Sequence, residues 1–267
     1  MGLRLAWLTD IHLNFVEPRA IEKFAWDVLA TRPDAVLIGG DIGHARDVVA
    51  YLGLLHGLLK LPIFFVLGNH DYYHGSIAAV RAEVGAFARR TKDLTWLTAS
   101  GPVSLTTHTA LVGHDGWGDG GFGNTQGSDV ILNDFVLIED MCVPDRGSLL
   151  AVLRRLGEEA ATHLRKALTQ AVQHHTQILA LTHVPPFREA AWHQGRESDE
   201  NWLPYFACKA VGDVLREIMT VSPHCQLSVL CGHTHGAGRC HIGSNIEVVT
   251  GGAEYGRPCV QQVIEVE

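Results

Sequence analysis

The four residues Gly68-Asn69-His70-Asp71 come directly after a continuous apolar run at residues 63–67. A run of this length and continuity is typical of a central strand that is covered on both faces. The glycine permits a sharp turn at the end of such a strand, and the next residues present an amide, an imidazole and a carboxylate. The segment therefore predicts a buried strand whose carboxyl end carries side chains of the kinds that bind metal ions.

Four more apolar runs end in the same way, with aspartate or histidine within a few residues. They are residues 3–9 with Asp10 and His12, residues 35–38 with Asp41, residues 178–182 with His183, and residues 227–231 with His233 and His235. Helical spacing of apolar residues at 17–31 and 48–59, between the first three runs, predicts right-handed crossovers and a mostly parallel sheet. Because the carboxyl ends of parallel strands meet at one edge, we expect these distant side chains to converge on one spot.

The spacing and the residue types of these side chains suit a transition-metal site. Asp10 and His12 are two residues apart, as are His233 and His235, so that in an extended chain each pair points the same way. Imidazole, carboxylate and one neutral amide oxygen together favour Mn, Fe, Zn or Co over Ca²⁺, which prefers oxygen ligands alone.

Two other segments carry weaker patterns. Residues 148–175 predict a long helix, which Gly157 would weaken or split. Residues 246–267 predict a β-hairpin with turns at Gly251, Gly252 and Gly256.

Composition excludes several classes of protein. The formal net charge of -8 argues against a protein that holds a nucleic acid polymer by its overall charge. No apolar run approaches the ~18 residues of a membrane helix, and the N-terminus lacks a signal-peptide pattern, so a cytoplasmic location is expected. The six cysteines form no CxxC pair, and we interpret them as reduced thiols.

The ordered series DIH (10–12), GD (40–41), GNHD (68–71), TH (182–183) and GHTH (232–235) resembles the calcineurin-like metallophosphoesterase superfamily. The resemblance spans roughly residues 3–249, and its finer pattern is similar to the class III cyclic nucleotide phosphodiesterases. It implies an α/β fold, a four-layer αββα sandwich with a metal site at the C-terminal ends of the central strands. The expected organisation is a single domain over residues 1–267, with loop insertions at 114–130 and 187–206.

The resemblance also implies a role for each motif residue. One metal would be bound by Asp10, His12, Asp41 and His235. Asp41 would bridge to a second metal, which Asn69, His183 and His233 complete. His70 would contact the phosphate and protonate or stabilise the leaving oxygen. Asp71 would either orient His70 or cap a helix N-terminus, and the two interpretations have equal weight.

The implied reaction is hydrolysis of a phosphate ester by attack of a metal-bound hydroxide. Two divalent or trivalent ions among Mn, Fe, Zn and Co are expected as cofactors. Two divalent ions bring four positive charges, of which Asp10, Asp41 and a bridging hydroxide remove three, so a phosphodiester monoanion would neutralise the centre. A small phosphodiester is therefore the expected partner.

Several alternatives stay open. The same metals serve a phosphomonoesterase or a protein phosphatase. A repair-type nuclease would need a basic track, which the composition does not show. A non-catalytic metal-bound scaffold would have a degraded site, whereas here both Asp10 and His70 are present. Trp117, Trp192 and Trp202 would either stack on a nucleobase or pack loops onto the body.

Overall fold

The computed structural model describes residues 2–267, which form two main β-sheets. The first sheet has the order β13-β1-β2-β3-β4. Its strands are β1 (Leu3–Leu8), β2 (Ala35–Gly39), β3 (Ile63–Val66), β4 (Leu94–Trp96) and β13 (Gln262–Val266). The strands β1 to β4 are parallel, and β13 pairs antiparallel with β1 at the edge.

The second sheet has the order β11-β12-β10-β7-β6-β5. Its strands are β5 (Val103–Ser104), β6 (Thr109–His114), β7 (Gln177–Thr182), β10 (Gln226–Cys231), β11 (Gly238–Ile242) and β12 (Ile246–Thr250). The four central strands are parallel, whereas β5 and β11 are antiparallel edge strands. A separate hairpin pairs β8 (Trp192–His193) with β9 (Arg196–Glu197).

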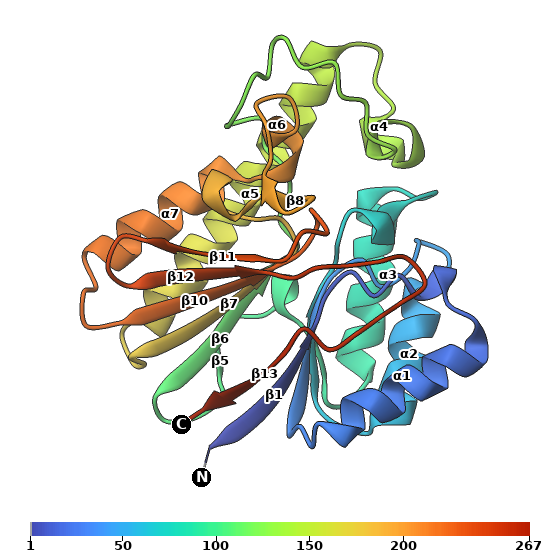
Figure 1. The fold of residues 1–267 in the computed structure, drawn as a ribbon, viewed down its shortest axis with the longest axis vertical. Helices are drawn as coiled ribbons and strands as arrows, with labels where there is room; N and C mark the ends of the chain where they lie inside the picture. Colours follow the sequence, from blue (N-terminus) through green and yellow to red (C-terminus); the bar gives the residue numbers. More distant parts are fainter. Residues whose placement is uncertain (1) are drawn as a thin grey trace.

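Helices cover the outer face of each sheet (Figure 1). The first sheet carries α1 (Pro18–Ala30), α2 (Val48–Leu59) and α3 (Ile77–Arg90), and the second carries α5 (Arg146–Ala171) and α7 (Lys209–Thr220). The short helices are α4 (Asp134–Leu137), α6 (Leu203–Phe206), η1 (Leu13–Phe15), η2 (His70–Tyr72), η3 (Leu97–Ala99), η4 (Glu139–Met141) and η5 (Arg188–Ala190). Each long helix turns an apolar stripe toward its sheet, as in α1, where Ile21, Phe24 and Val28 are buried.

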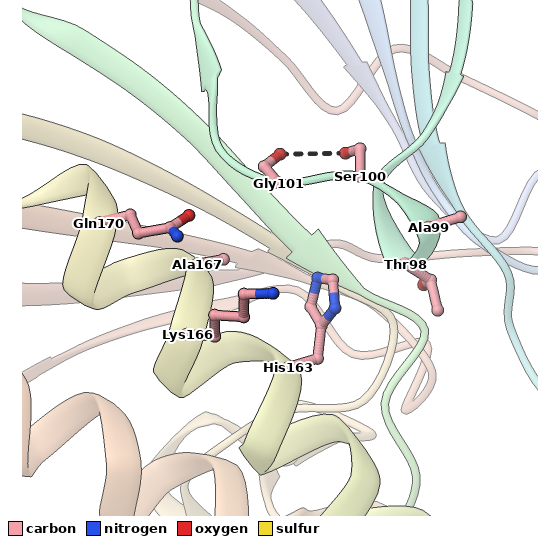
Figure 2. A pocket seen from close by; sticks show the side chains of 8 residues that line it. All are labelled: Thr98, Ala99, Ser100, Gly101, His163, Lys166, Ala167 and Gln170. Carbon is pink, nitrogen blue, oxygen red and sulfur yellow. Dashed lines mark hydrogen bonds between the residues drawn. The ribbon is translucent and has the colours of Figure 1, made fainter.

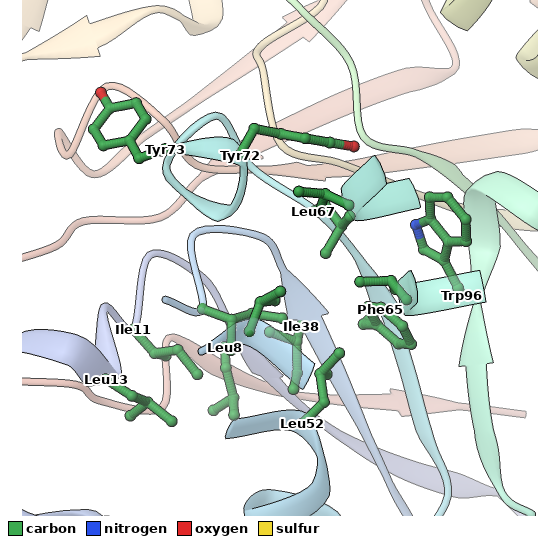
Figure 3. Close-up of a cluster of buried hydrophobic side chains, with 14 of the residues drawn as sticks. Leu8, Ile11, Leu13, Ile38, Leu52, Phe65, Leu67, Tyr72, Tyr73 and Trp96 are labelled. Atoms are coloured by element: carbon green, nitrogen blue, oxygen red, sulfur yellow. The ribbon is translucent and has the colours of Figure 1, made fainter. Parts of the chain in front are cut away.

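Three apolar clusters separate the layers. One joins α1, α2 and α3 to the first sheet, and part of it is drawn in Figure 3. A second joins α5 and α7 to the second sheet. A third lies between the two sheets and includes Leu5, Trp7, Leu37, Leu179 and Leu230. The order helix, sheet, sheet, helix confirms the predicted four-layer fold and explains why the central strands are apolar on both faces.

Two predictions about secondary structure are wrong, namely a split of the long helix at Gly157 and a C-terminal hairpin. Helix α5 continues through Gly157 without a break. A Cβ at Gly157 would lie 2.5 Å from Cβ of Asp119, so the glycine makes room for that side chain. The carboxylate of Asp119 accepts hydrogen bonds from the backbone amides of Lys209 and Ala210, at the start of α7.

The C-terminal segment is not a hairpin. Strand β12 pairs with β10 and β11 in the second sheet, whereas β13 pairs with β1 in the first. The connection between them, with Gly251, Gly252 and Gly256, therefore crosses from one sheet to the other (Figure 1).

The two segments expected as loop insertions differ in their local structure. Residues 115–133 contain neither helix nor strand. Residues 187–206, by contrast, hold η5, the β8–β9 hairpin and α6. All six cysteines are free thiols. Across residues 2–267, none of the helices combines the length and apolar character that crossing a lipid bilayer requires.

Two helical glycines predict opposite effects of the same substitution. Gly157→Ala should lower the free energy of unfolding by about 1–3 kcal/mol, since its methyl group displaces Asp119 from the start of α7. Gly57→Ala, in an exposed position of α2 with nothing within 4 Å of the new Cβ, should raise it by about 0.5–1 kcal/mol. Urea unfolding followed by circular dichroism measures both. Equal stabilisation by the two substitutions would contradict the packing argument.

Candidate metal centre

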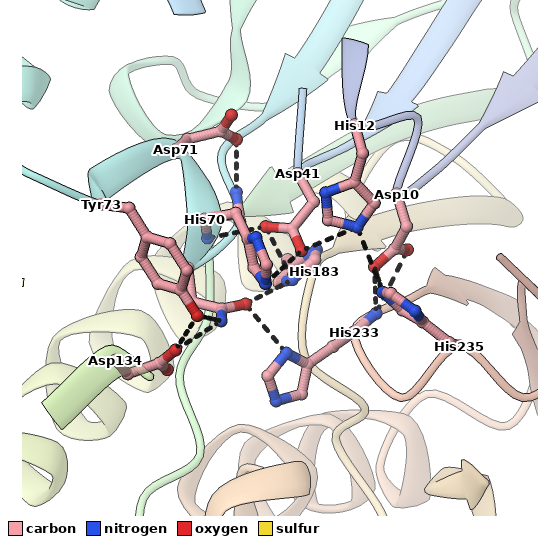
Figure 4. Close-up of polar contacts among 12 residues, drawn as sticks. Asp10, His12, Asp41, His70, Asp71, Tyr73, Asp134, His183, His233 and His235 are labelled. Carbon is pink, nitrogen blue, oxygen red and sulfur yellow. Dashed lines mark hydrogen bonds and ion pairs between the residues drawn. The ribbon is translucent and has the colours of Figure 1, made fainter. Parts of the chain in front are cut away.

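The side chains singled out in the sequence meet beyond the carboxyl ends of five strands (Figure 4). They follow β1, β2 and β3 in the first sheet and β7 and β10 in the second. The residues brought together are Asp10, His12, Asp41, Asn69, His70, His183, His233 and His235. The parallel direction of these strands places the five ends along one rim, as the sequence predicted.

One group of ligand atoms comes from Asp10, His12, Asp41 and His235. All four atoms lie within 4.8 Å of one another. His12 Nε2 is 3.2 Å from His235 Nε2 and 3.6 Å from Asp41 Oδ2, and His235 Nε2 is 3.4 Å from Asp10 Oδ1. Two imidazoles and two carboxylates at this separation form a candidate transition-metal site.

A second group surrounds the side-chain oxygen of Asn69. Asn69 Oδ1 is 3.0 Å from both His183 Nε2 and His233 Nδ1. His183 Nε2 is also 3.4 Å from Asp41 Oδ1. Asp41 thus directs one oxygen toward each group, which is the geometry expected of a bridging carboxylate.

The protons of this second group lie on its outer side. His183 Nδ1 is 2.8 Å from the carbonyl oxygen of Gly39, and His233 Nε2 is 3.1 Å from that of Tyr205. A carbonyl oxygen only accepts hydrogen bonds, so each of these ring nitrogens carries the proton and donates it. In a neutral imidazole the other nitrogen is then a bare lone pair. Both lone pairs face Asn69 Oδ1, which is itself an acceptor, and a cation is the partner that satisfies all three.

Asp134 fixes which atom of Asn69 faces the histidines. Asn69 Nδ2 donates to Asp134 Oδ1 at 2.8 Å, and Tyr73 Oη donates to the same oxygen at 2.6 Å. A carboxylate only accepts hydrogen bonds, so the amide nitrogen must turn toward it and the amide oxygen away from it. Asp134 could not be found from the sequence, because it begins the short helix α4, 65 residues away from Asn69, and stands in no motif.

The backbone at the rim is strained. Asp10, His12, Asp41, His233 and His235 all have φ between 41° and 70°, in the left-handed region. Such conformations cost about 1–3 kcal/mol each for residues with a side chain and collect at functional sites. Gly68 and Gly232 contribute differently, since a Cβ at either position would collide with the carboxylates of Asp41 and Asp10 respectively.

Asp71 takes neither of the two roles considered for it. Its carboxylate accepts hydrogen bonds from the backbone amides of Ile42, Gly43 and Gly68, at 2.8 to 2.9 Å. Within the described chain, Nδ1 of His70 is buried without a hydrogen-bond partner, so Asp71 does not orient it. Asp71 instead ties the loop after β2 to the loop after β3, which holds Asp41 beside Asn69.

A model of the calcineurin-like phosphoesterase family matches residues 3–237, which include every side chain of both groups. The chain belongs to the calcineurin-like phosphoesterase family. This family is that of the metallophosphoesterases, whose members are hydrolases acting on phosphate esters. The resemblance stated from the motifs is confirmed.

Curated relatives match this chain over short stretches. An uncharacterised metallophosphoesterase of Campylobacter jejuni is 35% identical over 77 residues, 27% of this chain and 21% of its own length. A probable cyclic nucleotide phosphodiesterase of Pseudoalteromonas is 34% identical over 82 residues, 26% of this chain and 31% of its own. A UDP-2,3-diacylglucosamine pyrophosphatase of Chlamydia trachomatis is 33% identical over 93 residues, 30% of this chain and 28% of its own. The aligned stretches thus span less than a third of each relative.

Solved structures share the whole fold. A phosphopantetheinyl hydrolase from Mycobacterium tuberculosis superposes with a TM-score of 0.68 at 14% identity, covering 98% of this chain and 95% of that one. A dimetal phosphatase from Danio rerio gives a TM-score of 0.57 at 14% identity, covering 93% and 86%. At such identities the likeness establishes the architecture of the phosphoesterase and nothing finer.

Burial sets the charge state of the phosphoesterase's candidate centre. It lowers the pKa of His12 and of His233 to about 3 and that of His70 to about 2, so these rings are neutral at neutral pH. Burial, reinforced by Asp10 and Asp71, raises the pKa of Asp41 well above its ordinary value. Neutral imidazole is the form that binds a metal, and a cation at this centre would displace any proton from Asp41.

A cavity of about 280 Å³ opens onto both groups. Its walls include Tyr73, Asp134, Phe206 and Tyr255, along with Asp41, Asn69, His70, Leu132, Asn133, His193, His233, Thr234 and His235. Neither lysine nor arginine lines it in the part of the chain that the structure describes.

The three tryptophans considered for nucleobase stacking do not line this cavity. Trp117 is buried against Tyr72, with ring centroids 5.4 Å apart. Trp202 stacks on His193, with centroids 6.1 Å apart, and Trp192 packs against Gly238. All three pack loops onto the body. A second cavity of about 270 Å³, lined by His163, Lys166 and Ser100 among others, shares no residue with the first (Figure 2).

The contact between Asp134 and Asn69 predicts a selective loss of metal affinity. Asp134→Ala frees the amide of Asn69 to rotate and should weaken binding of one of two ions by about 10–100-fold. Asp134→Asn, which can still accept from the amide, should weaken it less. Manganese titration followed by electron paramagnetic resonance counts the ions at each concentration. Two ions bound by the alanine variant with the parent's affinities would refute the role of Asp134.

Proposed function

We propose that this chain is a single-domain, dinuclear metal-dependent phosphoesterase that hydrolyses a small phosphodiester. The observation that carries the proposal is the inward-facing set of lone pairs on Asn69, His183 and His233, next to the group of Asp10, His12 and His235. Asp41 directs one oxygen to each group, so the two sets of ligands form one centre for two ions. The donor set suits Mn, Fe, Zn or Co.

The protein's contribution is to hold ligands and substrate in place. When bound, two such ions supply Lewis-acid activation of water and neutralise charge on the phosphate. Asp71 and Asp134 lock the loops that carry Asp41 and Asn69. Ligands fixed in this way need no rearrangement when substrate arrives, which lowers the barrier to reaction.

His70 is the group that we assign to the leaving oxygen. Its Nε2 lies 4.0 Å from Asp41 Oδ2, and its ring stacks on Tyr73 with centroids 4.2 Å apart. The side chain also lines the cavity, so it faces substrate from beside the ligands rather than from among them. A neutral imidazole in this position can donate an N–H hydrogen bond that stabilises the oxygen departing from phosphorus.

Charge favours a diester over a monoester. Two divalent ions bring four positive charges, and Asp10, Asp41 and an attacking hydroxide bring three negative charges. About one positive charge is left for the substrate to neutralise. A diester carries one negative charge and neutralises the centre. A monoester dianion would add a second, and the cavity wall, as described, holds no lysine or arginine to offset it. The partial likeness to a probable cyclic nucleotide phosphodiesterase supports the same class.

The choice of diester is tested with two chromogenic substrates. With added manganese, kcat/KM for bis-p-nitrophenyl phosphate should exceed that for p-nitrophenyl phosphate by about tenfold or more, a difference of ~1.4 kcal/mol in the barrier. Chelation should abolish both activities, and manganese should restore them. Preference for the monoester would favour a phosphomonoesterase or protein phosphatase. Fewer than one ion per chain, with no activity, would favour a scaffold.

The assignment of His70 predicts a separation of metal binding from turnover. His70→Ala should keep both ions and lower kcat on bis-p-nitrophenyl phosphate by about 10²–10⁴-fold. His174→Ala, an exposed histidine beyond the end of α5, is the matched control and should behave as the parent. Metal content and steady-state rates are measured on the same preparations. A His70→Ala variant as fast as the parent would show that the assignment is wrong.

A further inference from the structure

Two large aromatic side chains stand exposed beside the candidate centre. Phe15 is 52% exposed and Tyr255 is 48% exposed. The Tyr255 ring lies 4.6 Å from that of His12 and 5.1 Å from that of His235, centroid to centroid, and 4.9 Å from the ring of Phe15. Tyr255 also lines the cavity, so one of its faces borders the space where a substrate would bind.

The turn that carries Tyr255 is fixed at its base. It lies in the connection from β12 to β13 (Figure 1). The backbone amide of Ala253 donates to the carbonyl of His235 at 3.2 Å. The side chain of Gln261 closes the base through two hydrogen bonds with the backbone of Gly252, at 2.8 and 3.1 Å.

The tip of this turn rests against the segment that carries Phe15. Gly256 has φ of +77°, and a Cβ there would lie 3.3 Å from the carbonyl oxygen of Phe15. Phe15 also contacts the rings of His12 and His44, each at 6.2 Å between centroids. The backbone segments that carry the two aromatic rings are therefore held in place before any ligand arrives, which limits the entropy lost on binding.

Exposure of these rings has a cost that a ligand would remove. An aromatic side chain gains free energy when its face is covered, and ring-on-ring stacking contributes beyond the area buried. The cavity wall offers no lysine or arginine among its described residues, so recognition of the ester group beyond the phosphate falls to aromatic and polar contacts. Tyr255 lies beside His12 and His235 and lines the cavity, so its ring is available to such an ester group.

We propose that Tyr255, supported by Phe15, is a stacking platform for a planar ring in one ester group of the substrate. The proposal rests on the proposed function and narrows its substrate class to phosphodiesters that carry an aryl or heteroaromatic group, of which a nucleoside is one kind. Tyr255 is then a specificity-determining residue, and the phosphate chemistry stays with the metal ligands and His70.

The test compares substrates with and without a ring. The ring-bearing substrates are bis-p-nitrophenyl phosphate and adenosine 3′,5′-cyclic monophosphate, and the aliphatic one is glycerophosphoethanolamine, measured by its KM or by its inhibition of bis-p-nitrophenyl phosphate hydrolysis. Tyr255→Ala should raise KM for a ring-bearing substrate about tenfold, within the range for stacking on an aromatic side chain. Its kcat, its metal content and the constant for the aliphatic diester should stay within about twofold of the parent.

Further variants separate stacking from other effects. Tyr255→Phe keeps the ring and should match the parent, whereas Tyr255→Leu keeps apolar bulk without a ring face and should resemble Tyr255→Ala. Phe15→Ala removes the support and should raise KM about two- to tenfold, the range for an aromatic pair. Trp26→Ala, at an exposed aromatic residue of α1 that does not line the cavity, is the control and should have no effect.

The outcomes distinguish this proposal from the proposed function. If the parent hydrolyses no diester of either kind, the proposed function fails first. If the parent hydrolyses diesters but Tyr255→Ala changes both substrate types equally, or Tyr255→Leu matches the parent, the platform is refuted while the phosphodiesterase stands. A selective effect on bis-p-nitrophenyl phosphate and the cyclic nucleotide together supports a general ring platform, and an effect on the nucleotide alone supports a nucleoside ester.

Discussion

Lone pairs that face one another inside the protein impose the constraint on which the rest of the structure depends. One ring nitrogen of His183 donates to the carbonyl of Gly39, and one of His233 donates to the carbonyl of Tyr205. The other nitrogen of each ring points at the amide oxygen of Asn69. Without a cation these acceptors repel one another. The surrounding hydrogen bonds must therefore hold them, and the fold supplies those bonds from both sheets.

The two-sheet architecture makes such a centre possible. Parallel strands end along one rim, and the turns that leave them are forced into left-handed backbone conformations at five of the ligand residues. Strain of this kind persists only where neighbouring contacts over-determine the conformation. Asp71 supplies several of these contacts by accepting three backbone amides from two different loops. The apolar side chains packed between the two sheets and between each sheet and its helices make the strands that carry these loops rigid.

The cavity divides recognition between charge and shape. Beside the cavity, the carboxylates of Asp10 and Asp41 and the imidazoles grouped with them favour cations and, through them, a phosphate. Aromatic side chains line the same cavity, where a site for polyanions would have basic residues. This arrangement agrees with the proposed preference for a small, singly charged ester over a nucleic acid polymer, as does the formal net charge of -8.

The sequence by itself determined the five strands that end at the candidate centre, the polar residues that follow them and the class of the fold. Apolar runs are encoded locally, and the periodicity that predicts a buried strand needs no knowledge of its neighbours. The motif residues could be named for the same reason, since each stands at a fixed distance after its run. The tertiary structure alone decided how β12 and β13 are shared between sheets, why Gly157 faces Asp119, and that Asp134 orients Asn69. Each of those features depends on contacts between segments that are distant in the sequence. Such contacts leave no pattern in the order of the amino acids.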